Sequence, residues 1–193
     1  MEQTVSGGTI TFNTYGATLT TTATGSRSAS LKWVVGQGTG DDVALRSQSP
    51  LIGIMVGTSS ITDSGTSSMF AGMGSVTVGG TGHTFTGDHV GFKVLRAVTT
   101  NSLYATQADG TTENASAALA TLNSYDVLEL IIKINSTTSA DYYWRRNGGA
   151  LSSATNLTTN LIDNNDARIQ ISTSNDSTAV TYAWNANGAF YER

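Results

Sequence analysis

The sequence predicts an all-β protein, built from antiparallel strands as a two-sheet sandwich or a barrel. The clearest sign is the segment 126–134, in which Leu128, Leu130, Ile132 and Ile134 fall on one face of a strand and Glu129 and Lys133 fall on the other. Alternation with a period of two is typical of a half-buried strand. Abundant Ser and Thr, with frequent Gly and Asn, favour strands and turns over helices. Short strand-like segments separated by turn residues recur along the chain, as in sandwiches and barrels.

A long antiparallel hairpin is expected at the most regular part of the chain. The alternating strand is followed by a short polar turn and by an aromatic segment at 141–146, which Asn147-Gly148-Gly149 closes with a second turn. Alternation should place Tyr142 and Trp144 on one face of this strand and Tyr143 on the other. Only part of the aromatic set can therefore be exposed.

The remaining elements follow in chain order. Strands are expected at residues 9–13, 16–22, 31–35, 51–56, 67–74, 90–98, 103–107, 167–173 and 178–184. The segment 51–56 is apolar throughout and should be buried on both faces. Loops are expected at 36–42, 57–66, 79–88 and 151–165. The segment 115–122, with Asn114 as an N-cap, is either a short helix or an ordered loop.

The chain is long enough for one sizeable domain. Its 193 residues fit a single β-sandwich, which we expect over residues 9–193, and residues 1–8 would form an N-terminal arm. Cysteine is absent, so neither disulfides nor thiolate metal ligands are available.

Charge excludes some partners. Only 12% of residues are charged and the net charge is −4, which argues against a nucleic-acid binder. No apolar run approaches the ~20 residues that span a bilayer, so we expect no membrane partner. The first residues lack the basic and apolar regions of a signal peptide. We expect that the protein is made in the cytoplasm of a host and that it works within an assembly.

Several short motifs occur in a fixed order between residues 90 and 185. They are Val90-Gly91-Phe92-Lys93, Leu103-Tyr104-Ala105-Thr106 with Asp109-Gly110-Thr111-Thr112, the strand 126–134, the segment 142–148, Thr158-Thr159-Asn160-Leu161 and Ala183-Trp184-Asn185. In this order they resemble concanavalin-like jelly-roll domains of the lectin and laminin-G type, in the style of bacteriophage structural proteins. The resemblance covers about half of the chain. It implies an all-β, two-sheet antiparallel jelly-roll sandwich and a role in a phage virion.

Catalysis is not expected from this sequence. Retaining glycosidases need two carboxyl groups ~5 Å apart, and none of Glu2, Glu113, Glu129 and Glu192 sits in the Glu-x-Asp-x-x-Glu run of the laminarinase-type members of this fold. His83, Asp88 and His89 share one segment, but a metal site there lacks a full ligand set, so a polar loop is the better interpretation. We therefore expect no enzyme activity, no metal and no cofactor.

Two groups of residues suit a sugar-binding site. Tyr143 and Trp144 could stack on a sugar ring, although aromatic side chains more often fill a core. Asp163 and Asn165 offer oxygen ligands for calcium or sugar hydroxyls, although the same residue types favour turns for local reasons.

The first hypothesis for function is a non-enzymatic decoration or cement protein of a phage capsid, located in the virion. Its partners would be the major capsid protein or other virion proteins, and the resemblance suggests a homotrimer. An arm carrying Glu2, Gln3, Thr4 and Val5 could add a strand to a neighbour, and Arg145 and Arg146 could bind an acidic surface or form solvated ion pairs. The alternative is a glycan- or receptor-binding module of a tail fibre or tail spike.

Overall fold

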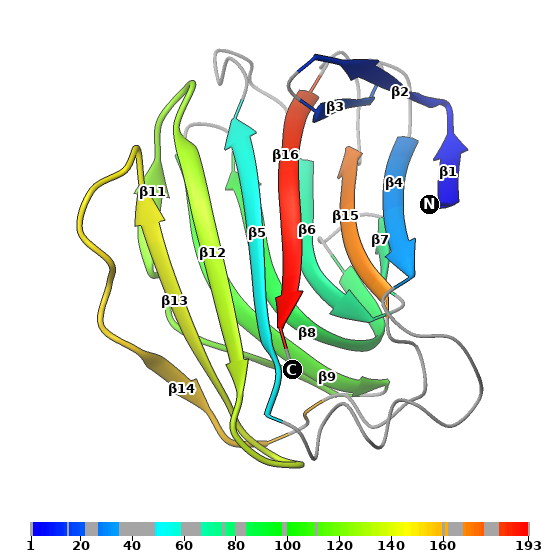
Figure 1. The fold of residues 1–193 in the computed structure, drawn as a ribbon. Coiled ribbons are helices and arrows are strands. Elements are labelled where there is room, and N and C mark those ends of the chain that lie inside the picture. Colours follow the sequence, from blue (N-terminus) through cyan, green and yellow to red (C-terminus); the bar gives the residue numbers. More distant parts are fainter. Residues whose placement is uncertain are drawn as a thin grey trace.

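The computed structural model describes most of the chain as two facing β-sheets. It covers residues 2–14, 16–21, 27–34, 49–58, 67–74, 76–79, 84–97, 100–110, 112–159, 161, 168–175 and 182–192. Within these ranges every element is a strand, and no helix is long and apolar enough to cross a membrane. Figure 1 shows the strands running side by side in two curved layers, with the N-terminus at one edge. The prediction of an all-β antiparallel sandwich is confirmed.

The first sheet contains nine strands in the order β1-β4-β15-β6-β8-β9-β10, with β11 paired to β9 and β7 to β8. Their bounds are β1 Glu2–Ser6, β4 Arg27–Val34, β6 Ser67–Gly74, β7 Thr77–Gly79, β8 Thr84–Ala97, β9 Thr100–Gly110, β10 Glu113–Ala115, β11 Ala120–Leu122 and β15 Arg168–Asn175. Strands far apart in sequence, such as β4 and β15, are direct neighbours here.

The second sheet contains seven strands in the order β14-β13-β12-β5-β16-β3-β2. Their bounds are β2 Gly8–Asn13, β3 Gly16–Thr21, β5 Leu51–Thr58, β12 Val127–Ile134, β13 Ala140–Arg146, β14 Thr155–Leu157 and β16 Tyr182–Glu192. The strand pairs within both sheets are antiparallel.

The core lies between the two sheets and is filled by the alternating apolar residues. Leu128, Leu130, Ile132 and Ile134 are fully buried, as their alternation predicts. Phe92 from the nine-stranded sheet meets Tyr142 from the seven-stranded sheet edge to face, with ring centroids 5.5 Å apart. The Tyr142 hydroxyl donates a hydrogen bond to the side chain of Gln107 at 2.8 Å, which links the two sheets inside the core.

The predicted hairpin is present as β12 and β13, in a register that pairs Ile131 with Tyr143. The turn after β13 has Asn147 and Gly148 at φ 53° and 69°. Positive φ at both central residues is the reason that Asn-Gly suits this turn.

Several expected boundaries differ from the structure. The segment 115–122 is not helical, because Glu113–Ala115 and Ala120–Leu122 form β10 and β11, both paired with β9. Residues 84–88 belong to β8 and not to a loop, residues 57–58 continue β5, and β14 interrupts the loop expected at 151–165. In β5 the outward Met55 is 39% exposed, so this strand is not buried on both faces throughout.

The segment that the sequence predicted as an N-terminal arm lies at a sheet edge. Residues 2–6 form β1, which pairs with β4 of the same chain, because a Thr- and Val-containing segment satisfies its backbone groups on the nearest open sheet edge. Among the described strands, β1 is the outermost of the nine-stranded sheet and has a strand partner on one side only.

Candidate functional site

Arg145 and Arg146 of β13, which were predicted to bind a partner, form ion pairs within the chain. Arg145 donates a short hydrogen bond to Glu129, its register partner on β12. This bond raises the pKa of Arg145 above its usual value. Arg146 lies 3.5 Å from the Asp126 carboxylate. The arrangement matches the interpretation of solvated ion pairs, while a partner role for either arginine stays a prediction.

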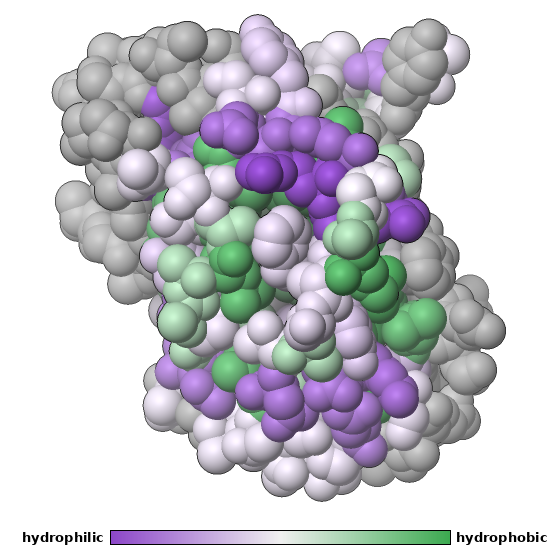
Figure 2. Space-filling view, turned by 90° about the vertical axis from the view of Figure 1, so that its left-hand side faces the viewer, coloured by the Kyte–Doolittle hydropathy of each residue, from purple (hydrophilic) through white to green (hydrophobic). Residues whose placement is uncertain are grey.

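The aromatic residues of β13 do not form a flat platform. Tyr143 faces outward and is half-buried, whereas Trp144 faces inward and packs against the core. Figure 2 views the side of the molecule where β11, β13 and β14 lie in Figure 1, and shows hydrophilic residues above and below a strip of neutral and apolar ones. A sugar could stack on Tyr143 but not on both rings at once.

Asp163 and Asn165 lie outside the described residues, as does His83. Within the described part of the chain, no group of three His, Asp or Glu side chains is placed to hold a metal ion. Asp88 and His89 lie in β8, where both are buried.

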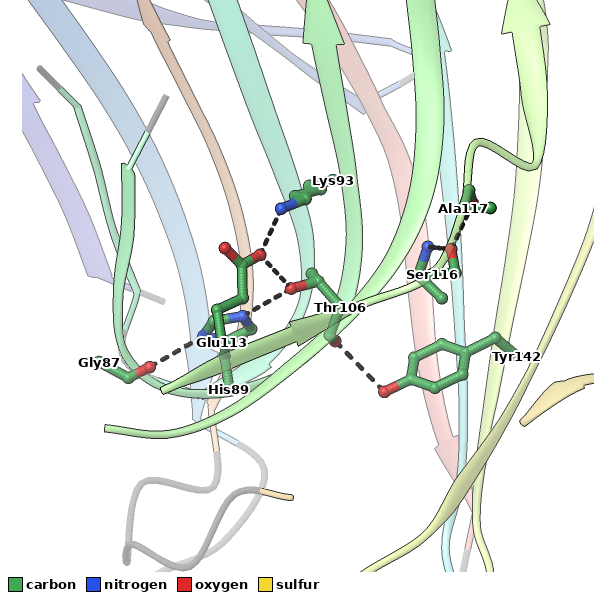
Figure 3. Close-up of polar contacts among 9 residues, drawn as sticks. Gly87, His89, Lys93, Thr106, Glu113, Ser116, Ala117 and Tyr142 are labelled. Carbon is green, nitrogen blue, oxygen red and sulfur yellow. Dashed lines mark hydrogen bonds and ion pairs between the residues drawn. The ribbon is translucent and has the colours of Figure 1, made fainter. Parts of the chain in front are cut away.

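A network of buried polar groups lies on the outward face of β8, β9 and β10 (Figure 3). His89 Nδ1 lies 2.8 Å from the Gly87 carbonyl oxygen and Nε2 lies 3.0 Å from the Thr106 hydroxyl. Thr106 and Lys93 both donate hydrogen bonds to Glu113. Burial is the main cause that lowers the pKa of His89.

This network contains residue types that occur in active sites, but its histidine and threonine side chains are not accessible to solvent. His89 and Thr106 are fully buried, and the Lys93 ammonium lies 5.2 Å from the centre of the Phe85 ring. The imidazole and the hydroxyl are closed to solvent, and the hydrogen bonds of the network join β8, β9 and β10.

A polar hollow lies on the outward face of the same sheet, at the end that carries β1. Its volume is about 130 Å³, and its walls come from Thr4, Ser28, Ser30, Lys32, Val76, Thr77, Gln170 and Ser172. The strand register aligns Thr4, Ser30 and Ser172 in one row across β1, β4 and β15, and places Lys32 beside Gln170 in the next. Side chains in such rows lie on one face of the sheet.

The wall of the hollow is fixed by the side chain of Gln170. Its carbonyl oxygen accepts a hydrogen bond from the Val76 N–H at 3.1 Å, and its amide nitrogen donates to the Val76 carbonyl at 2.7 Å. Gln170 is buried, with 1% of its surface exposed. These two bonds hold the segment that leads into β7 against β15, so that β7 forms one side of the hollow.

A signal for this site is present in the sequence, outside the motifs named above. Residues 27–34 alternate Ser28, Ser30 and Lys32 with apolar residues, and β15 alternates Gln170 and Ser172 with Ile169 and Ile171. Small polar residues on one face of two strands become a site only when the strands are adjacent. The sequence does not show that adjacency.

The fold is shared with lectin-like domains, although no protein-family model and no curated protein matches the sequence. A legume lectin-like domain from Entamoeba histolytica superposes with a TM-score of 0.60 at 10% identity, covering 99% of this chain and 89% of that one. The CBM2 module of the evolved Dit protein of Lactobacillus casei BL23 phage J-1 gives 0.58 at 9% identity, covering 94% and 80%. An endo-β-1,4-glucuronan lyase from Trichoderma reesei gives 0.57 at 12% identity, covering 96% and 89%.

The chain has a concanavalin-like β-sandwich fold. Identities of this size establish the fold alone, because one fold supports both binding and catalysis. The resemblance in the second half of the sequence therefore extends to the architecture of the whole described chain.

Proposed function

We propose that this protein is a non-enzymatic binding module that holds a saccharide in the polar hollow of the nine-stranded sheet. The observation that carries the proposal is a concave site walled by serine and threonine hydroxyls and one lysine, with its wall held in place by Gln170. Preformed concave sites with a few fixed polar groups are typical of small-ligand sites. Sugars are rich in hydroxyl groups that pair with such side chains.

The similar structures support a saccharide as the ligand. One is a lectin-like domain, and another is a module of a phage protein. The phage module also supports the virion as the setting, in which this chain would act as a receptor-recognising part of a tail or of the shell surface.

Binding to a glycan array, followed by titration of a glycan that the array identifies, tests the proposal. Ser28→Leu should block the hollow, because the larger side chain projects into it. Ser102→Leu is the matched control, since Ser102 is a half-buried serine on the outward face of the same sheet, on β9. We expect glycan binding that Ser28→Leu abolishes and Ser102→Leu retains.

Two results would contradict the proposal. A glycan array on which the protein binds nothing would exclude a saccharide as the ligand. Loss of binding in Tyr143→Ala, with binding retained in Ser28→Leu, would move the ligand to β13.

A second candidate function is decoration of a phage capsid, in which the protein would form a homotrimer on the shell. The open edge of β1 favours it, because Gln3, Thr4 and Val5 are exposed there and an edge strand can pair with a strand of a partner. Co-sedimentation with undecorated shells tests this function. Saturable binding that Val5→Lys weakens, together with a silent glycan array, would favour decoration over saccharide binding.

A further inference from the structure

We infer that the group received by the hollow is an anion, namely the carboxylate, sulfate or phosphate of an acidic saccharide. This inference rests on the proposed function and names the class of ligand. Its basis is a chain of hydrogen bonds that ends in an unused donor beside Lys32.

The side chain of Gln170 determines which atom donates and which accepts in this series of hydrogen bonds. The Val76 N–H can only donate, so the atom of Gln170 that faces it must be the carbonyl oxygen. The other end of the amide is therefore the NH₂ group, which donates to the Val76 carbonyl and to the Ser172 hydroxyl oxygen. The orientation of the amide follows from the backbone, as such assignments require.

The donor and acceptor roles of the two serine hydroxyl groups follow from the orientation of the Gln170 amide. Ser172 accepts from Gln170 and donates its own proton to the Ser30 hydroxyl oxygen, at 2.8 Å. Ser30 accepts from Ser172, and its own proton has no acceptor among the described residues. The chain thus ends in an O–H donor at the wall of the hollow.

Lys32 places a positive charge beside that donor. Three other cations form ion pairs, since Lys93 binds Glu113, Arg145 binds Glu129 and Arg146 binds Asp126. Lys32 has no such carboxylate among the described side chains, and none of the residues that line the hollow is acidic. The strand register places Glu2 of β1 opposite Lys32. An ammonium group carries three donors and no acceptor.

A site that offers donors and a positive charge suits a group that only accepts. Carboxylate, sulfate and phosphate oxygens meet this condition, and their charge-assisted hydrogen bonds are roughly twice as strong as neutral ones. The hollow of about 130 Å³ is small beside the roughly 300–1,000 Å³ of typical ligand pockets. We therefore expect it to receive the charged group, while the rest of the saccharide lies over the surface.

Calorimetric titration with four probes tests the inference. They are a tetrasaccharide of hexuronic acid, the same tetrasaccharide with its carboxyl groups reduced to alcohols, a sulfated tetrasaccharide and inorganic phosphate. The reduced compound is the matched ligand control because it replaces each carboxylate with a neutral hydroxymethyl group and keeps the rest of the saccharide. We expect it to bind at least tenfold more weakly than an acidic tetrasaccharide.

Matched variants locate the charge. Lys32→Gln should lower the affinity for the acidic tetrasaccharide at least tenfold and leave the affinity for the reduced one nearly unchanged. Lys133→Gln is the control, because Lys133 is exposed on the other sheet. Glu2→Gln should retain or strengthen acidic binding, since the register pairs Glu2 with Lys32. Ser30→Ala should weaken acidic binding several-fold, and Ser30→Thr, which keeps the hydroxyl, should restore it.

Each outcome is informative. Preference for the uronate over the sulfated compound assigns the anion to a carboxylate, and the reverse preference assigns it to a sulfate. Phosphate alone, bound in a manner that depends on Lys32, supports the anion site without a sugar. Equal binding of the acidic and reduced tetrasaccharides through the hollow would overturn the anionic ligand and leave saccharide binding intact. Failure of all four probes and of the glycan array would overturn both.

Discussion

The hydrogen bonds of Gln170 to Val76 predict that Gln170→Leu lowers the free energy of unfolding substantially, although the two side chains are similar in volume. Gln170→Leu keeps a similar volume but removes the side-chain partners of the Val76 N–H and carbonyl groups. Gln170 and Val76 are both buried, at 1% and 5% exposure. Each buried backbone group left without a partner costs about 1–3 kcal/mol.

Two such groups give a loss of about 2–6 kcal/mol in the free energy of unfolding. For a chain of this length that loss lowers Tm by roughly 4–24 °C, at about 2–4 °C per kcal/mol. Chemical denaturation and calorimetry measure both quantities. Hydrogen exchange should also show faster exchange of the Val76 amide, because β7 opens more easily.

The matched control is Gln3→Leu, the same substitution at an exposed position of β1. Surface changes of this kind usually stay within about 0.5 kcal/mol. If Gln170→Leu were as stable as Gln3→Leu, and the Val76 amide kept its protection, then Gln170 would not hold β7 and the reasoning about the wall of the hollow would be wrong.

Three further predictions concern the sandwich itself. Tyr142→Phe removes the hydrogen bond to Gln107 across the core and should cost about 1–2 kcal/mol by denaturation; an unchanged midpoint would contradict it. Gly91→Ala would place a methyl group 2.7 Å from the Ala71 carbonyl oxygen, so calorimetry should show a loss of about 1–3 kcal/mol; wild-type stability would show that the strands can separate at no cost. Burial lowers the pKa of His89, so protonation favours the unfolded chain, and the free energy of unfolding should fall as pH drops below the unfolded pKa of about 6.5. His89→Gln should flatten that part of the stability profile, and an equal slope in both proteins would refute the assignment.

The strands of the sandwich were predictable where side chains alternate strongly. β12 follows from its apolar face, and the turn at Asn147 follows from the residue types that tolerate positive φ. The edge strands were harder. Ala115 and Ala120 have high helix propensity, yet both lie in strands, because pairing with β9 satisfies their backbone groups and overrides local preference.

The candidate site was not predictable from the sequence, for a topological reason. Ser30 and Ser172 are separated by 142 residues and are joined by one hydrogen bond. Gln170 is also far from Val76 in sequence, at 94 residues, although its side chain bonds both backbone groups of that residue. The aromatic and basic residues on β13 could be proposed as a site from their residue types alone. Serine residues form a site only when the fold places them next to one another, which the sequence does not show.

Binding through the hollow is the central claim, and amide chemical-shift mapping during titration with an acidic tetrasaccharide tests it most directly. The claim predicts saturable shifts at Ser28, Ser30 and Lys32 on β4 and at Ser172 on β15, which line the hollow, with a midpoint at least tenfold higher in Lys32→Gln. Shifts confined to β12 and β13, or no shifts at saturating ligand, would contradict it.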